Sequence, residues 1–240
     1  MTLCFHNTIS VHTLDPIPGV TIWYARIPDI IASFFTNGTY HNWGVGVNEL
    51  FKKENFTINC FSAPEIKAVN QFKALKKQLE WMAGRYLVKQ LIHSVFLPDQ
   101  MLEQIQLSYH EQGAPFVTQH PDLSFSLSHS HDFTAAACTI RPGQTLGLDI
   151  EKIAKTPDAA FLKTAFTPKE IGAMPLEADH IFTNWTIKEA FLKFIKKGFH
   201  ESLHQVEIIN RKILYKGKQS HVDVFTERIG KNYVLSLVYD

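Results

Sequence analysis

The segment LGLDIEKI, residues 146–153, places two carboxylates inside an otherwise apolar stretch. As a β-strand it sends alternate side chains to opposite faces. The aliphatic face then comprises Leu146, Leu148 and Ile150. Asp149 and Glu151 share the other face with Gly147, and two like charges there repel each other. A chain that folds this way must either leave that face in water or cover it with a positive group.

Composition restricts the chain to an ordinary globular protein. Its 240 residues are 45% hydrophobic and 20% charged, which suits one large domain or two small ones with a true core. The formal net charge is only +1, so the whole molecule has no field that attracts nucleic acid or anionic lipid. A row of lysines at 73, 76 and 77 is explained by the solvated side of a helix. We expect no nucleic-acid partner.

Cysteine spacing and the lack of long apolar runs indicate the compartment. Cys4, Cys60 and Cys138 lie far apart and form no CxxC pair, which suits reduced thiols better than disulfides or a cysteine zinc site. The first residues show no basic start followed by an apolar run, and no stretch approaches about 18 apolar residues. We expect a soluble cytoplasmic protein without a signal peptide or a membrane span.

Two capping boxes predict where helices begin. Residues 62–65, Ser-Ala-Pro-Glu, precede an apolar stripe of helical period, so we expect one helix from there to about Leu91. Residues 167–170, Thr-Pro-Lys-Glu, predict a second helix. A third should run from about Asn184 to Lys197 and end at Gly198, with lysines in its last turn.

Strand patterns occur on both sides of these helices. The predicted strands cover residues 19–27, 124–128, 132–140, 146–153, 206–209, 212–215, 221–225 and 233–239, with the sequence HSH as the turn between the second and the third. Turn residues at 141–144 mark the best break in the chain. We therefore predict an α+β fold of two similar lobes, 1–141 and 142–240, each a small antiparallel sheet with a long helix.

The third predicted helix carries charges within a mostly apolar surface, so it should be largely buried. Glu189 and Lys193 have the spacing of a surface ion pair that stabilises a helix only slightly. Taken with Asp149 and Glu151, Glu189 completes a set of three carboxylates. Oxygen ligands of this kind suit Mg²⁺, which proteins often share with substrate phosphates. From the residues alone, both interpretations stay open.

Two of these segments resemble the signature motifs of the 4′-phosphopantetheinyl transferases. They are GLDIEK at 147–152 and WTIKEAFLK at 185–193. Four further segments resemble the family in the same order along the chain: LEWMAGRYLVKQLI (79–92), GAPFV (113–117), FSLSHSHDF (125–133) and FTPKE (166–170). The length and the two lobes are similar to the surfactin-type branch and unlike the short trimeric holo-acyl-carrier-protein synthases.

This resemblance implies a fold and a reaction. The two lobes would be related by pseudo-twofold symmetry, and a monomer would bind coenzyme A in the cleft between them. The enzyme would move the 4′-phosphopantetheine arm of coenzyme A onto a serine of an acyl or peptidyl carrier protein and release adenosine 3′,5′-bisphosphate. Mg²⁺ would neutralise the pyrophosphate, and Mn²⁺ accepts the same oxygen ligands.

The resemblance also assigns roles to individual residues. The metal ligands would be Asp149, Glu151 and Glu189. Glu189 would take the proton of the carrier serine only as a second role, because a metal-bound carboxylate is a poor base. Lys193 would neutralise the pyrophosphate or the leaving group. Coenzyme A phosphates would contact Ser128, His129 and Arg85, although Arg85 suits a solvated helix arginine nearly as well.

One residue departs from the family pattern. Ala114 stands where the family usually has a lysine between a glycine and a proline, so another cation must replace that lysine or binding there is weaker. Lys188, in contrast, is expected to brace its helix and not to contact substrate.

Other interpretations have less support in the sequence. A non-catalytic relative that binds coenzyme A or a carrier protein would have no reason to keep the metal ligands. An unrelated Mg²⁺-dependent phosphate enzyme lacks a Walker loop, and residues 44–48, GVGVN, do not form a GxGxxG motif. His129 and His131 invite a zinc site, but no further ligand occurs at zinc-site spacing.

Overall fold

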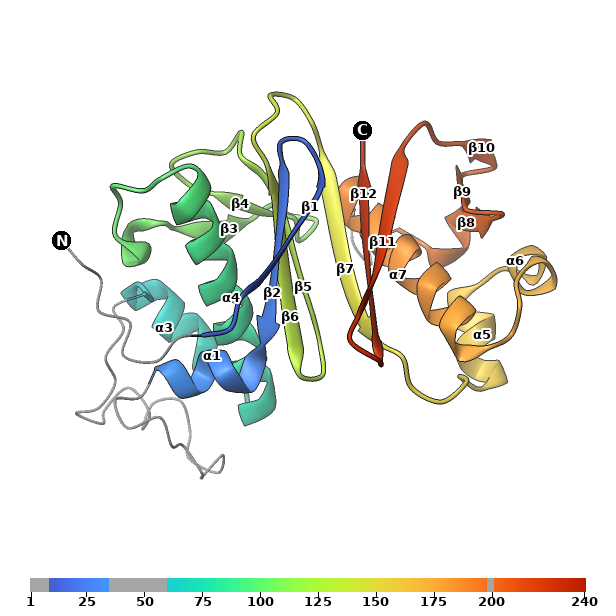
Figure 1. Ribbon diagram of the computed structural model, residues 1–240, viewed down its shortest axis with the longest axis horizontal. Coiled ribbons are helices and arrows are strands. Elements are labelled where there is room, and N and C mark those ends of the chain that lie inside the picture. The colour runs from blue at the N-terminus through green and yellow to red at the C-terminus, as the bar shows by residue number, and fades with distance from the viewer. Residues whose placement is uncertain (1–8, 35–59, 198–200) are drawn as a thin grey trace.

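The computed structural model describes residues 9–34, 60–197 and 201–240 of the chain. Two antiparallel sheets pack against each other at its centre, and helices cover their outer sides (Figure 1). The first sheet has the order β1 (His12–Ile17), β2 (Val20–Arg26), β6 (Phe133–Thr139) and β5 (Ser124–Ser130). The second has the order β11 (Asp223–Ile229), β12 (Tyr233–Tyr239) and β7 (Leu146–Lys152). The predicted α+β class is confirmed.

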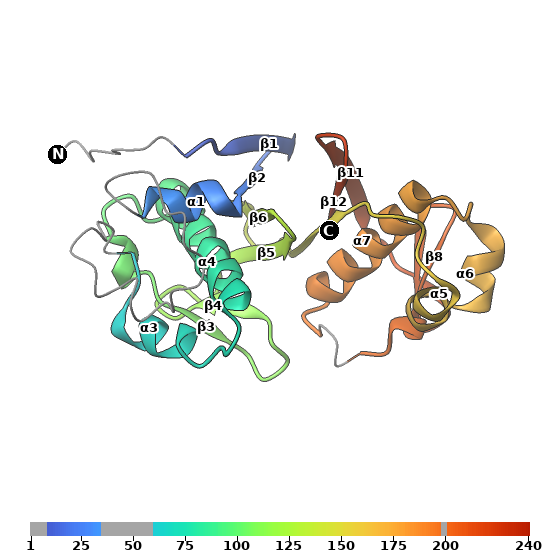
Figure 2. The ribbon, with the colours of Figure 1, turned by 90° about the horizontal axis from the view of Figure 1, so that it is seen from below.

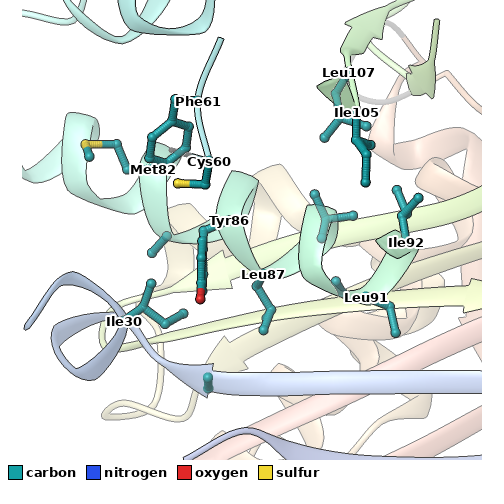
Figure 3. Packing of buried hydrophobic residues seen from close by; sticks show 14 of the residues in the cluster. Ile30, Cys60, Phe61, Met82, Tyr86, Leu87, Leu91, Ile92, Ile105 and Leu107 are labelled. Carbon is teal, nitrogen blue, oxygen red and sulfur yellow. The ribbon is translucent and has the colours of Figure 1, made fainter. Parts of the chain in front are cut away.

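The largest core cluster lies between the first sheet and helix α4 (Leu75–Val95). Figure 3 shows Met82, Tyr86 and Leu87 of this helix packed among Ile30 of helix α1 (Ile27–Ser33) and the side chains that precede helix α3 (Ala63–Val69). The helix is buried along most of its length, so its apolar stripe supplies the main hydrophobic stabilisation of this half.

A second core cluster joins the two sheets. The aliphatic face of β7, including Leu148 and Ile150, packs against Ile22 of β2 and Ala135 of β6. These side chains are fully buried. The prediction that one face of residues 146–153 is a core face is therefore confirmed.

The second face of β7 is covered by helix α7 (Ala178–Phe194), not by water. Figures 1 and 2 show α4 and α7 on opposite sides of the paired sheets. Gly147 makes this close packing possible, because a Cβ added there would lie 2.1 Å from the carbonyl oxygen of Ala190 and 2.3 Å from the amide nitrogen of Phe194. Glycine at this position thus allows helix and strand backbones to touch.

Shorter elements complete the two outer regions. Beside α4 lies the hairpin of β3 (Leu107–Tyr109) and β4 (Pro115–Val117), next to a 3₁₀ turn at Leu102–Gln104. Around α7 lie α5 (Ala159–Ala165), α6 (Pro168–Ala173), a 3₁₀ turn at Leu203–Gln205, and a small sheet of β8 (Val206–Ile209), β9 (Lys212–Tyr215) and β10 (Lys218–Gln219). The turn between β6 and β7 contains the predicted boundary between lobes 1–141 and 142–240, which stays a prediction.

The same buried ion pair occurs once in each half of the chain. Both capping boxes form, and both glutamates point inward. Glu65 accepts a hydrogen bond from Lys89 on α4 at 2.7 Å, and Glu170 accepts one from Lys188 on α7 at 2.8 Å. Both lysines are fully buried. Each pair ties a short capped helix to a long one, and the bracing role predicted for Lys188 is confirmed.

The single helix predicted from residue 62 to Leu91 is wrong. The chain forms α3 and α4 instead, joined by residues 70–74. The carboxylate of Glu65 bonds to both Arg85 and Lys89, which requires the two helices to lie side by side and not end to end. A tertiary interaction thus interrupts a helical period that looks continuous in the sequence.

Helix α7 differs from its prediction at both ends. It begins at Ala178 and not at Asn184, because Ile181 is buried in a cluster with Phe166 and Met174. It ends at Phe194, well before Gly198, which lies outside the described residues.

The predicted turn HSH is also displaced. β5 continues through Ser130, and the turn begins at His131, whose φ is 51°. Ser130 stays in the strand because its hydroxyl bonds to β7. Within the described residues, no helix is long and apolar enough to cross a membrane.

We predict that Gly147→Ala lowers the free energy of unfolding by about 3 kcal/mol, because the added methyl group forces α7 away from β7. Urea denaturation followed by circular dichroism measures this. The matched control is Gly172→Ala in α6, where a Cβ would meet nothing within 4 Å. That substitution should stabilise the protein by about 0.5–1 kcal/mol. Equal effects of the two substitutions would contradict the proposed close packing.

Candidate active site between strand β7 and helix α7

Asp149 lies on the face of β7 that α7 covers, and a lysine of that helix forms an ion pair with it. The Lys193 ammonium nitrogen is 2.7 Å from Asp149 Oδ1. The hydroxyl of Ser128 donates to the same oxygen at 2.7 Å. Asp149 Oδ2 is buried and has no hydrogen-bond partner among the described residues. The positive group that the sequence requires over this face is therefore Lys193, but it occupies only one of the two carboxylate oxygens.

Glu151 is held in a fixed orientation by two neutral donors. Its Oε2 accepts a hydrogen bond of 2.7 Å from the Ser130 hydroxyl, and its Oε1 accepts one of 3.3 Å from the indole nitrogen of Trp185. Burial, followed by the charge of Asp149, raises the pKa of Glu151 to about 6, against the opposing effect of those two hydrogen bonds.

Glu189 reaches the same region from α7. Its side chain is buried, and Glu189 Oε1 has no hydrogen-bond partner among the described residues. Burial is the main cause that raises its pKa to about 7, followed by the charge of Asp149, while Lys193 opposes the shift. The surface ion pair between Glu189 and Lys193 does not form, because Lys193 bonds to Asp149 instead.

The three carboxylates fit a divalent cation in part. Asp149 and Glu189 each keep a buried oxygen without a partner, and unsatisfied carboxylate oxygens favour a hard cation such as Mg²⁺. Glu151 has both oxygens engaged. No group of three or more His, Cys, Asp or Glu side chains in the described part of the chain is arranged to hold a metal ion as it stands.

A cavity of about 520 Å³ opens beside these acids. Its walls come from the β3–β4 hairpin, strand β5 and the end of α7. The predicted site residues on its walls are Ser128, His129, Glu189 and Lys193, together with Ala114 on the hairpin. Burial lowers the pKa of His129, which favours a neutral imidazole there. Residues that lie far apart in the sequence thus converge on one cavity.

Arg85 does not take either of the roles considered for it from the sequence. Its guanidinium is buried, with Nε 3.0 Å from Glu65 Oε1 and Nη2 2.6 Å from the carbonyl oxygen of Leu107. Nη1 donates to the hydroxyl of Tyr109 at 3.3 Å. Arg85 is not among the residues that line the cavity, and its guanidinium already has three partners. It joins α3 and α4 to the hairpin that forms one cavity wall.

Sequence reasoning named Ser128 but missed that it belongs to a row of serines on β5. The hydroxyl of Ser126 accepts from the Leu148 amide at 2.9 Å, and that of Ser130 accepts from the Lys152 amide at 3.2 Å. With Ser128, these serines bind β7 along its edge and orient two of its carboxylates. The signal was present in SFSLSHS, where serine recurs at every second position.

Two family models match this chain. The family model described as 4′-phosphopantetheinyl transferase superfamily matches residues 145–238, and the one described as 4′-phosphopantetheinyl transferase, N-terminal, matches residues 50–141. Both models name the same activity, and together they cover most of the chain.

Three curated relatives carry the same name. The 4′-phosphopantetheinyl transferase psf-1 of Bacillus pumilus is 33% identical over 142 residues, 57% of this chain and 58% of that protein. That of Aneurinibacillus migulanus, gsp, is 26% identical over 191 residues, 76% of this chain and 77% of that protein. Sfp of Bacillus subtilis (strain 168) is 28% identical over 171 residues, 65% of this chain and 73% of that protein.

We predict that Arg85→Gln lowers the free energy of unfolding by about 3 kcal/mol, because it removes one partner of a buried ion pair. Chemical denaturation measures this, with Lys67→Gln on the exposed side of α3 as the control. Full stability of Arg85→Gln combined with a loss of phosphate affinity would contradict the structural role.

A second prediction concerns pH. Glu189 has an ordinary pKa of 4.5 and a folded-state pKa of about 7, so the folded protein binds the proton more tightly than the unfolded chain. Its contribution to stability is complete below pH 4.5 and is lost as the pH rises through 7. In EDTA, Glu189→Gln should therefore be more stable than wild type at pH 8 by on the order of 2 kcal/mol, and equal to it near pH 4. Thermal melts across pH test this, with the exposed Glu111→Gln as the control. Parallel pH profiles for Glu189→Gln and wild type would contradict it.

Proposed function

Because the chain belongs to the 4′-phosphopantetheinyl transferase superfamily, we propose that it transfers the 4′-phosphopantetheine arm of coenzyme A to a serine of an acyl or peptidyl carrier protein. The observation that carries this proposal is the ion pair of Lys193 with Asp149, placed beside a cavity that Glu189 also lines. The similarity of the chain to psf-1, gsp and Sfp supports placing it in the surfactin-type branch.

The reaction balances without an oxidant or a further reactant. The serine oxygen of the carrier protein attacks the phosphorus next to pantetheine, a new P–O bond forms, and the bond to adenosine 3′,5′-bisphosphate breaks. The serine proton leaves to a base, and the leaving group takes up negative charge. Catalysis of such a transfer consists mainly of positioning and charge neutralisation.

The residues of the cavity divide these tasks. Lys193, partly exposed beside the cavity, would neutralise the pyrophosphate or the leaving group. His129 would contact coenzyme A phosphates from β5, and Ser128 would do so by exchanging the hydrogen bond that its hydroxyl donates to Asp149. Glu189 would serve first as a metal ligand, and accepting the serine proton would be a second role.

The carboxylates Asp149, Glu151 and Glu189 would hold Mg²⁺, or Mn²⁺ in its place. When bound, the ion supplies positive charge for the pyrophosphate oxygens. Two unpartnered oxygens, one on Asp149 and one on Glu189, support this assignment. The hydrogen bonds from Ser130 and Trp185 would keep the carboxylate of Glu151 in place.

We also propose that the two halves are related by pseudo-twofold symmetry. The duplicated ion pair supports this in detail. Lys89 donates to the carbonyl oxygen of Cys60 at 2.8 Å, and Lys188 donates to that of Ala165 at 2.8 Å. Cys60 and Ala165 each lie two residues before the first residue of a capping box. Equivalent positions in the two halves thus make equivalent bonds.

We further propose that the protein is a monomer and works in the cytoplasm. Cys60 and Cys138 are buried free thiols, and burial raises the pKa of Cys138 to about 12, which keeps it protonated and unreactive. Free thiols of this kind suit a reducing compartment.

We predict that a panel of apo carrier proteins gains the mass of one phosphopantetheine arm on incubation with this protein, coenzyme A and Mg²⁺. Intact-mass spectrometry measures the gain, which EDTA should abolish. Asp149→Asn should slow the transfer by about 100-fold or more, because it removes a carboxylate that the cation and Lys193 both need. The exposed Asp223→Asn serves as the control. Coenzyme A binding without transfer to any carrier would favour a non-catalytic relative instead.

A further inference from the structure

Helix α7 ends in a motif that normally contains glycine. The amide of Lys196 donates to the carbonyl oxygen of Lys193 at 3.0 Å, and the amide of Lys197 donates to that of Leu192 at 3.1 Å. These two bonds define a Schellman motif, in which the residue at the position of Lys196 is left-handed and is most often glycine. Lys196 has a φ of 56°. A side chain at this position costs conformational energy that glycine would avoid.

Lys196 is exposed and lies on the wall of the cavity that also holds Glu189 and Lys193. The hairpin residues Gly113, Ala114 and Pro115 line the same cavity and bring no charge to it. The lysine side chain is therefore placed where an anionic ligand in the cavity would need a cation.

The two neighbouring lysines each have a carboxylate partner. The ammonium group of Lys193 bonds to Asp149, and that of Lys197 lies 3.6 Å from a carboxylate oxygen of Glu201. Among the described residues, Lys196 makes no ion pair with a carboxylate. Of the lysines at 193, 196 and 197, it is the one without a carboxylate partner in the described part of the chain.

The negative end of the helix dipole does not explain this arrangement. Lys193 and Lys197 already place positive charge around the last turn of α7, where cations are favourable. A third lysine in a strained conformation adds little to that effect. A ligand that needs its charge provides a reason for lysine at a position suited to glycine.

We propose that Lys196 binds a phosphate group of coenzyme A and is a specificity-determining residue of the cavity. The inference rests on the proposed function, because coenzyme A is the anionic ligand that this function requires. The ammonium group would make a charge-assisted hydrogen bond to a phosphate oxygen. Both the pyrophosphate and the 3′-phosphate offer that chemistry.

Isothermal titration calorimetry on the full chain tests the proposal with three variants. Lys196→Gln and Lys196→Gly remove the charge and should weaken coenzyme A binding by about tenfold, the effect of one charged contact. Lys196→Arg keeps the charge and should bind within about threefold of wild type. Thermal melts separate the backbone effect, because Lys196→Gly should melt at a higher temperature than Lys196→Gln.

The matched control is Lys197→Gln, which removes the same positive charge one residue further along the chain. It should bind coenzyme A like wild type. Titrations with 3′-dephospho-coenzyme A and with pantetheine identify the contacted group. If Lys196→Gln loses affinity for both nucleotides, the contact is to the pyrophosphate; if it loses affinity for coenzyme A alone, the contact is to the 3′-phosphate. Pantetheine binding should not change.

Unchanged coenzyme A affinity in Lys196→Gln, or an equal loss in Lys197→Gln, would overturn the assignment of Lys196. In either case the transfer assay with wild-type protein shows whether the proposed function still stands. If wild-type protein bound no coenzyme A at all, both proposals would fail together.

Discussion

The site depends on the direct contact between the backbones of strand β7 and helix α7. Gly147 allows the carbonyl oxygen of Ala190 and the amide of Phe194 to approach the strand so closely that no side chain fits between them. The contact brings Glu189 and Lys193 of the helix to the strand face that carries Asp149. The contact therefore places the charged groups of α7 that are proposed to take part in transfer against the carboxylates of the strand.

Burying these charges is costly, and the structure compensates for each of them differently. Glu170 and Lys188 pair fully, as do Glu65 and Lys89 in the other half. Burial of a hydrogen-bonded pair holds helices in position even where it adds little net stability. The acids of the site are less well compensated, because Asp149 and Glu189 each retain an oxygen without a hydrogen-bond partner among the residues that the structure describes. This difference in compensation supports the proposal that the acids form a binding site, whereas the paired residues brace the helices.

Features encoded in local patterns could be predicted from the sequence. The two faces of residues 146–153 followed from the period of a strand, and both capping boxes from the spacing of Ser62 or Thr167 with a glutamate. The convergence of Ser128, His129, Glu189 and Lys193 followed from family resemblance and not from spacing, and the structure places all four on one cavity.

What could not be predicted depends on partners distant in the chain. From the sequence, Arg85 could be a phosphate contact or a solvated helix arginine, but Glu65 and Leu107 bind its guanidinium in the fold. The break between α3 and α4 has the same cause. The left-handed backbone conformation of Lys196 was not predicted, because glycine is the residue expected just after a helix end and the nearest glycine in the sequence is at 198.

The most direct test of the account is the melting temperature of the protein with and without Mg²⁺, because an ion that binds only the folded state must stabilise it. Asp149→Asn/Glu189→Gln removes the two carboxylates with unpartnered oxygens and is the comparison. Saturating Mg²⁺ should raise the melting temperature of wild type by several degrees and leave that of the double variant unchanged. An equal shift in both proteins, or none in wild type, would contradict the claim that β7 and α7 together form a cation site.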